Sequence, residues 1–171
     1  MNKSLHINFN ANDINNAIAK LERLDTEIKN LPKKLIQEIA IDGLDYLNSL
    51  YSATQFDENS GDINTSVKET SSGYAIIASG KDILYEEFGT GEIGKENPHP
   101  EKSEYPLNDY NSGNFVKSHV NKNGRHYWFY KGKYYEGIPS GKQIFNTRNY
   151  ILNNGIKKAH DRLVGDMLSK L

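Results

Sequence analysis

The stretch from Ile83 to Gly91, with the sequence ILYEEFGTG, constrains the fold more than any other part of the chain. Side chains alternate between the two faces of a strand, so Tyr85 and Glu87 would share one face and Phe88 would lie on the other. Glycine allows backbone angles that a Cβ forbids, so Gly89 and Gly91 permit a sharp turn. We therefore predict a buried strand that ends in a glycine turn, with a structural motif formed by Tyr85, Glu87, Phe88, Gly89, Thr90 and Gly91.

The residues from Gly89 to Lys95 also match nucleotide-binding signatures, both G-x-G-x-x-G and G-x-x-x-x-G-K. A phosphate-binding glycine loop has to open a helix, whose first amides hold the anion. Here the loop runs into Pro98 and Pro100, and each proline disfavours helix in the residue before it. Glu96 stands where the P-loop has a magnesium-binding Ser or Thr. We expect a plain glycine turn and no nucleotide cofactor.

Length and composition favour one domain with a sizeable appended loop. The chain has 171 residues, 36% of them hydrophobic, and a net charge of −1 from 21 basic and 22 acidic residues. General nucleic-acid binders usually show a basic excess, so this balance argues against that class. The absence of cysteine excludes disulfides and thiolate zinc sites. No apolar run is long enough to span a bilayer, so we expect a soluble protein made in the cytoplasm.

Helical periodicity dominates the N-terminal third of the chain. A short strand is expected over Leu5–Phe9, and Asn12 or Asp13 is expected to cap the helix that follows. Leu31-Pro32 predicts a break, after which a second helix runs to about Tyr51. Both helices carry an apolar stripe, which either packs on the core or contacts a partner.

Strand patterns follow these helices. Residues 63–69, 74–79 and 83–88 predict three short strands in an antiparallel meander, covered by helices on one face. Residues 92–136 read as an insertion: a polar loop over 92–113, then a β-hairpin around Asn121–Gly124. From Lys142 to Leu171 the pattern is helical, with a kink expected near Asn153–Gly155. The predicted fold is therefore α+β, with two N-terminal helices and a long C-terminal helix on a small antiparallel sheet.

Candidate catalytic groups are few. The five histidines show no metal-ligand spacing. His119 and His126 could face each other across the hairpin as an acid–base pair, or they could be ordinary exposed strand residues. Glu86 and Glu87 are adjacent on the predicted strand and would point to opposite faces, so they could not act as a carboxylate pair. A buried Glu would need a hydrogen-bond donor, for which the Gly89–Gly91 turn is the simplest source.

Aromatic side chains crowd the hairpin beside basic residues. Three interpretations remain open: a local mini-core, a protein interface rich in Tyr, Trp and Arg, or a stacking surface for single-stranded nucleic acid. The residues of this possible partner interface are Arg125, Tyr127, Trp128, Phe129, Tyr130 and Tyr134.

The order of these parts resembles the HK97 gp10-like phage proteins, which are tail-completion or head–tail joining components. The similarity lies in an L-P-K-x-L-x-x-E-I-A-x-x-G segment from Leu31 to Gly43, in the Y-E-E-F-G-T-G segment ending at Gly91, and in a G-I-P-S-G-K-Q-I-F-N segment that begins at Gly137. E-F-G-T-G is the most specific of the three. The resemblance covers about residues 5–91 and 137–171, and residues 92–136 depart from the shorter family pattern.

This resemblance implies a structural virion protein and not an enzyme. Copies of the chain would form a ring, a hexamer or a dodecamer, that joins the tail to the head around a channel for DNA, which passes without sequence recognition. The implied partners are head-completion or connector proteins and tail-terminator or tail-tube proteins. The implied location is the virion neck, after assembly in the host cytoplasm. The alternative from another class is a small nucleic-acid-acting enzyme, or a binding module, that uses the His119/His126 hairpin.

Overall fold

One unbroken helix dominates the computed structural model, which describes residues 10–53, 63–80, 83–101, 114–130 and 133–169. Helix α1 spans Ala11–Ala53 and contains Pro32 in its interior, so the two predicted N-terminal helices are one. The apolar stripes before and after Pro32 are in phase along a single helix, and this shared packing face offsets the lost hydrogen bond. The cap is Asn10, whose Oδ1 accepts the Asp13 amide at 2.8 Å, and not Asn12 or Asp13.

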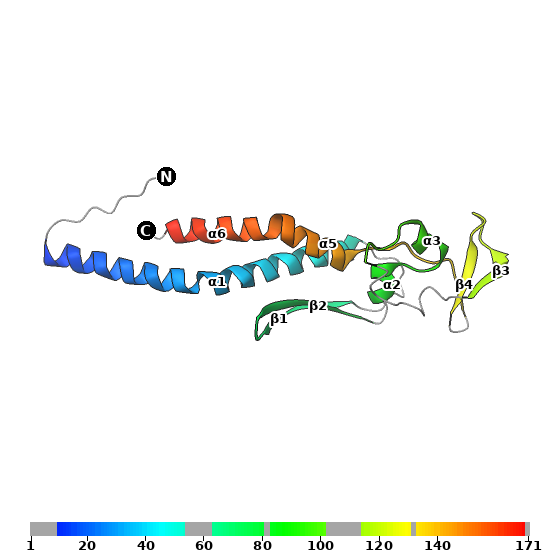
Figure 1. The fold of residues 1–171 in the computed structure, drawn as a ribbon, viewed down its shortest axis with the longest axis horizontal. Coiled ribbons are helices and arrows are strands. Elements are labelled where there is room, and N and C mark those ends of the chain that lie inside the picture. Colours follow the sequence, from blue (N-terminus) through cyan, green and yellow to red (C-terminus); the bar gives the residue numbers. More distant parts are fainter. Residues whose placement is uncertain (1–9, 54–62, 81–82, 102–113, 131–132, 170–171) are drawn as a thin grey trace.

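Strands β1 (Asn64–Thr70) and β2 (Gly73–Ser79) form the predicted antiparallel hairpin, in which Asn64 pairs with Ser79 and Thr70 with Gly73. This sheet lies along the C-terminal half of α1 (Figure 1). The third strand of the predicted meander is wrong, because Ile83–Phe88 forms helix α2. The fold is nevertheless α+β, as the sequence predicts.

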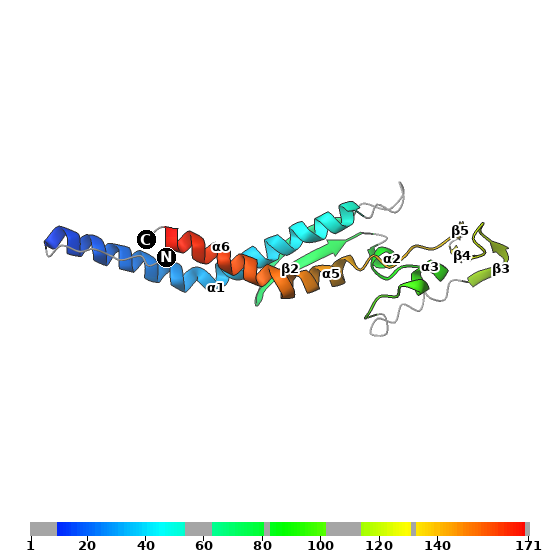
Figure 2. The ribbon, with the colours of Figure 1, turned by 90° about the horizontal axis from the view of Figure 1, so that it is seen from above.

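The closing helix runs back along α1, and both ends of the described chain lie towards the same side of the molecule (Figures 1 and 2). It consists of α5 (Gln143–Tyr150), one π-helical turn (Ile151–Gly155) and α6 (Ile156–Ser169). The predicted irregularity at Asn153–Gly155 is therefore a π turn. The rings of Tyr46 and Tyr150 stack 4.1 Å apart, and Tyr150 donates its hydroxyl to Asp42 at 2.8 Å.

A second small sheet lies at the far end of the molecule from the start of α1 (Figures 1 and 2). It contains β3 (Asn114–Val120), β4 (His126–Tyr130) and β5 (Lys133–Tyr135), paired antiparallel in the order β3-β4-β5. The hairpin predicted around Asn121–Gly124 is confirmed. The loop predicted from Glu92 is wrong at its start, where Gly91–Glu96 forms helix α3. The rest of that loop over 102–113, and the strand predicted over Leu5–Phe9, lie outside the described residues.

Few apolar side chains are buried in the described part of the chain. The buried ones are Ala17, Ala40, Leu47, Phe88 and Ala159, whereas large exposed apolar residues occur along α1, α2, β3, β5 and the whole closing helix with its π-helical turn. They include Ile28, Ile41, Leu152 and Tyr134. Large apolar surface left in water marks interaction sites in soluble proteins. Among the described helices, none combines the length and the apolar character that a membrane crossing requires.

Candidate functional site

Two glycine-containing segments that are almost fifty residues apart in sequence lie side by side. The turn Gly89–Gly91 joins α2 to α3, and the extended segment Gly137–Gly141 leads into α5. The Thr90 amide donates to the Ile138 carbonyl at 2.9 Å, and the Ile138 amide donates to Thr90 Oγ1 at 3.1 Å. The Gly141 amide donates to the Glu86 carbonyl at 2.8 Å. These bonds form a ladder, so the turn is fixed by the segment that precedes the closing helix.

The glycines allow this close approach. Gly89 has φ +71°, and a Cβ there would lie 2.6 Å from the Ser140 amide nitrogen. Gly91 has φ +66°, and a Cβ would lie 3.0 Å from the Cα of Gly137. Both positions need glycine for its backbone angle and for the space. The turn does lead into a helix, contrary to the expectation from Pro98 and Pro100, but α3 has only six residues and its first residue, Gly91, lies against the backbone of Gly137.

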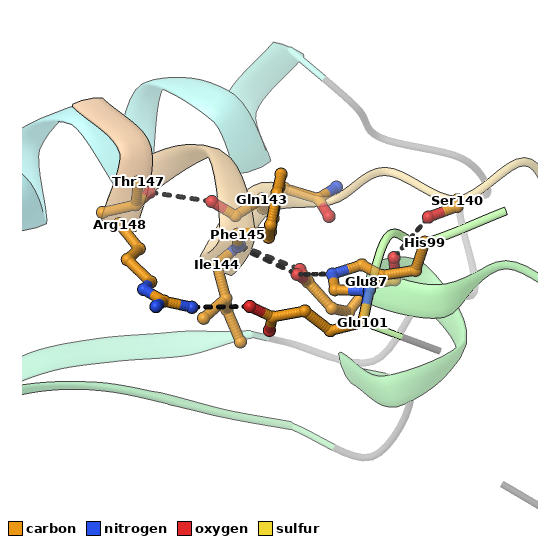
Figure 3. Close-up of polar contacts among 9 residues, drawn as sticks. All are labelled: Glu87, His99, Glu101, Ser140, Gln143, Ile144, Phe145, Thr147 and Arg148. Carbon is orange, nitrogen blue, oxygen red and sulfur yellow. Dashed lines mark hydrogen bonds and ion pairs between the residues drawn. The ribbon is translucent and has the colours of Figure 1, made fainter. Parts of the chain in front are cut away.

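Glu87 is the central side chain of the junction between this turn and the closing helix. Its carboxylate accepts the Ile144 amide at 2.8 Å and the Phe145 amide at 3.0 Å, both in the first turn of α5 (Figure 3). The residue before α5, Lys142, has a left-handed conformation and no capping side-chain bond. Glu87 therefore caps α5 from a distant helix, where a negative charge also meets the positive end of the helix dipole.

His99 completes the carboxylate's environment. Its Nε2 lies 3.0 Å from Oε1 of Glu87, and its Nδ1 accepts the Glu101 amide at 3.0 Å. Because Nδ1 accepts, the neutral ring carries its proton on Nε2 and donates it to Glu87. The ring also lies between Phe88 and Phe145, with centroids 4.5 and 5.3 Å away. Two buried polar groups are thus fully hydrogen-bonded inside an aromatic enclosure.

Further polar contacts tie the same junction to its surroundings (Figure 3). Ser140 Oγ donates to the Glu87 carbonyl at 2.7 Å, and Arg148 pairs with Glu101 at 2.5 Å on the outer side. The hydroxyl of Tyr51, near the end of α1, lies close to the carboxylates of Glu87 and Glu86. Burial, and then the charges of Glu87 and Glu86, raise the pKa of its hydroxyl, which has no hydrogen-bond partner among the described residues.

This arrangement holds the fold together and is closed to substrates. The side chains of His99 and Glu87 are only 2% and 4% exposed, and each of their polar atoms already has a partner. Acid–base catalysis requires that such groups reach the substrate. Within the described residues, no cluster of three or more His, Cys, Asp or Glu side chains could hold a metal ion. We assign the junction as a structural brace between α2, α3 and α5.

The predicted motif at residues 85–91 lies in a different secondary structure from the one expected. Tyr85, Glu87, Phe88, Gly89, Thr90 and Gly91 do lie together, but on a helix and a turn instead of a strand end. Glu86 and Glu87 are therefore not on opposite faces of a sheet, and both are buried. Glu87 finds its donors in α5 and His99, and not in the Gly89–Gly91 turn as predicted.

The hairpin histidines are not brought together as a pair by the strand register. His126 pairs across the hairpin with Val120, and no pairing involves His119, whose side chain lies outside the description. His126 instead meets Glu92, with its amide 2.9 Å and its Nδ1 3.1 Å from the carboxylate oxygens. Arg125 makes three hydrogen bonds of 2.8 to 3.0 Å to Glu96. Helix α3 thus holds the distal sheet by two acidic residues at i, i+4 spacing.

The aromatic patch is described in part. The rings of Tyr127 and Tyr134 pack edge to face, 6.4 Å apart, and Tyr127 donates to Glu136 at 3.3 Å. Tyr134 is 52% exposed. The side chains of Trp128, Phe129 and Tyr130 lie outside the description. Arg125 is engaged by Glu96, and the acidic side chains Glu92 and Glu136 also bond to described residues of this hairpin.

Sequence reasoning missed the roles of His99, Ser140, Glu92 and Glu96. A signal for the last two exists, because Glu92 and Glu96 are four residues apart and would share one helix face opposite the dipeptide Arg125-His126. No local signal indicates that Glu87 caps a helix more than fifty residues later. Comparison of the chain with protein-family models, curated proteins and solved structures finds no match.

Proposed function

We propose that this protein is a structural subunit of a phage head–tail connector, a neck or tail-completion component that assembles as a ring around the DNA channel. The proposal rests first on the resemblance of the E-F-G-T-G and G-I-P-S-G segments to the HK97 gp10-like proteins. These two segments form the brace, in which Thr90 and Ile138 exchange two hydrogen bonds. Two of the three segments that carry the resemblance therefore contact each other in the brace.

The observation that carries the assembly proposal is the amount of apolar surface left uncovered. Ile41, Leu152 and Ile156 are 43%, 60% and 44% exposed, whereas the buried apolar side chains in the described part are few. A chain of this size normally buries most of the surface that its unfolded state exposes. Contacts with neighbouring copies would supply the missing burial. Assembly is thus the simplest explanation of this surface.

A ring built from head-to-tail contacts needs two different patches on each subunit. The first is a pocket of about 390 Å³ between α1, β2 and the closing helix, with a mostly apolar lining that includes Leu47, Ile76 and Leu152. The second is the distal sheet, whose Tyr134 and Tyr135 are exposed. The two patches belong to different parts of the elongated molecule (Figure 1), which suits contacts between successive subunits and with neighbouring rings.

Electron microscopy of the purified chain tests the ring. We expect closed rings in negative stain and a matching oligomer mass by native mass spectrometry. Leu152→Glu places a charge at the pocket and should abolish the rings. Asn154→Glu is the matched control, because it adds the same charge at an exposed position outside the pocket lining and should leave rings intact.

The place of the protein in the particle requires the parent virion. A cryo-EM map should contain density for this chain at the neck, between the portal and the tail tube. A map of intact virions without such density would overturn the proposal. A gene neighbourhood that encodes portal, capsid and tail-tube proteins is the expected genomic setting.

A further inference from the structure

The N-terminal half of α1 extends beyond the end of its helical partner. Helix α6 runs antiparallel to α1, with Arg162 3.3 Å from Glu38, and it ends at Ser169. Figures 1 and 2 both show the first part of α1 projecting past that end. The projecting part carries large apolar side chains in solvent. Ile14, Ile18, Leu21 and Ile28 are 41%, 48%, 58% and 50% exposed.

All of these residues except Ile18 follow a seven-residue repeat. Ile14, Leu21 and Ile28 occupy one core position of successive heptads, and the second core position is filled by Ala17, Leu24 and Leu31. Such a repeat is the signature of a helix that packs along its whole length against another helix. The same stripe continues through Leu35 to Glu38 and Asp42, which contact the closing helix. The stripe is therefore one helix-packing face. Helix α6 covers its C-terminal part, whereas in the N-terminal part Ala17 is buried but Ile14, Leu21 and Ile28 are exposed.

We propose that a second copy of this chain covers the N-terminal part, with the two α1 helices antiparallel and centred between Leu21 and Leu24. In this register, Leu21 of each copy packs on Leu24 of the other, and Ile28 lies opposite Ala17, which is already buried within its own chain. The partner helix then runs in the same direction as α6 does along α1. The inference goes beyond the ring, because it concerns a symmetric contact that the free protein can make before assembly.

Charge complementarity selects this partner and this direction. The residues that precede the first core position of each heptad are Asp13, Lys20, Glu27 and Lys34, which alternate in sign. In the antiparallel register these positions face one another, so Asp13 meets Lys34 of the second copy and Lys20 meets Glu27. By symmetry this makes four attractive pairs. Each of the four charges thus faces an opposite charge on a copy of the same helix.

In a parallel pair of α1 helices, only one of these four charges would face an opposite charge on the second copy. There the same positions would face residues five places later on the second copy. Lys20 would meet Asp25, but Asp13, Glu27 and Lys34 would meet Ile18, Pro32 and Ile39. The sequence thus supports an antiparallel pair over a parallel one.

Charge exchange in the full-length protein tests the register. Sedimentation equilibrium of the wild type should give a dimer or a multiple of it, with a dissociation constant of roughly 1–100 µM. Lys20→Glu alone, or Glu27→Lys alone, places like charges opposite each other twice and should weaken the dimer about tenfold. The double variant, Lys20→Glu with Glu27→Lys, should return the constant to within about threefold of wild type. Circular dichroism confirms that each variant keeps its helix content.

Glu22→Lys is the matched control, since it makes the same charge change off the packing face and should have no effect. Leu21→Lys should abolish the dimer. A monomeric wild type at about 100 µM, as expected if residues 1–9 of the same chain cover the stripe, would overturn the inference. A double variant no better than the single variants would also overturn it.

Engineered cysteines test the direction, because the natural chain has none. Ile14→Cys and Leu31→Cys should each fail to cross-link to itself, since identical positions would be about 25 Å apart in the antiparallel pair. A mixture of the two variants should form disulfide-linked dimers under mild oxidation, because these core positions face each other in the proposed register. Self-cross-linking of either single variant without cross-linking in the mixture would show a parallel pair, in which identical core positions face each other, and would overturn the assignment.

Discussion

The carboxylate of Glu87 lies 3.0 Å from Nε2 of His99, and the two side chains are almost wholly enclosed. This contact links α2 to the segment that follows α3, while the same carboxylate caps α5. One buried side chain thus joins three parts of the chain. The stability of the fold should depend on it more than on any exposed ion pair.

Replacing Glu87 by Gln is expected to lower the free energy of unfolding by about 2–4 kcal/mol. The Gln amide keeps the shape of the carboxylate but lacks the negative charge that accepts hydrogen bonds from two α5 amides and from His99. Its NH2 group would also face one of these N–H donors, so that one hydrogen bond is lost. Urea denaturation measures the effect. The control Glu101→Gln, which removes the solvent-exposed pair with Arg148, should cost less than about 1 kcal/mol. Equal effects of the two substitutions would show that Glu87 is not a buried cap.

Gly89→Ala is expected to destabilise the protein by about 3 kcal/mol or more. The new Cβ needs a left-handed backbone and meets the Ser140 amide nitrogen at 2.6 Å. Gly124 separates the two causes, because it has φ +77° and nothing within 4 Å. Gly124→Ala should therefore cost only about 1 kcal/mol, from the backbone alone. Thermal unfolding that ranks the two variants equally would show that the close approach at Gly89 is unimportant.

Tyr51→Phe should change how stability depends on alkaline pH. Burial and the nearby Glu87 and Glu86 raise the pKa of the Tyr51 hydroxyl, so above about pH 10 the unfolded chain loses this proton while the folded chain keeps it. Wild-type stability should therefore fall more steeply above that pH than stability of the variant. Below it, the two proteins should show the same dependence of stability on pH, because the Tyr51 hydroxyl is protonated in both folded and unfolded states. Parallel alkaline titrations of urea midpoints measure the difference, and coinciding curves would contradict it.

The misread helix α2 shows where local pattern fails. Six residues with mixed apolar and acidic side chains fit a strand as well as a helix, because the segment is too short to separate the two periods. Tertiary contacts decide between helix and strand here, because Glu86 and Glu87 are both buried and Glu87 is hydrogen-bonded to α5 and His99. None of these partners is visible from the neighbouring sequence.

Pro32 misleads for a different reason. A proline inside a helix costs about 3 kcal/mol, so a break is the reasonable expectation from the residue itself. The wider pattern carries the opposite information, since Ile28, Leu31 and Leu35 keep the same heptad phase across it. By contrast, the β3–β4 hairpin and the closing helix follow from local signals, Asn123-Gly124 and an apolar repeat, and both are present.

The continuity of α1 has a mechanical consequence. Its 43 residues form one continuous helix, about 65 Å along its axis, that bends midway without a break (Figures 1 and 2). One end carries the uncovered apolar stripe, and the other carries Leu47 in the pocket wall and Tyr51 beside the brace. Because the helix is unbroken, a contact that moves its first turns would also move the Leu47 end, and with it the wall of the pocket.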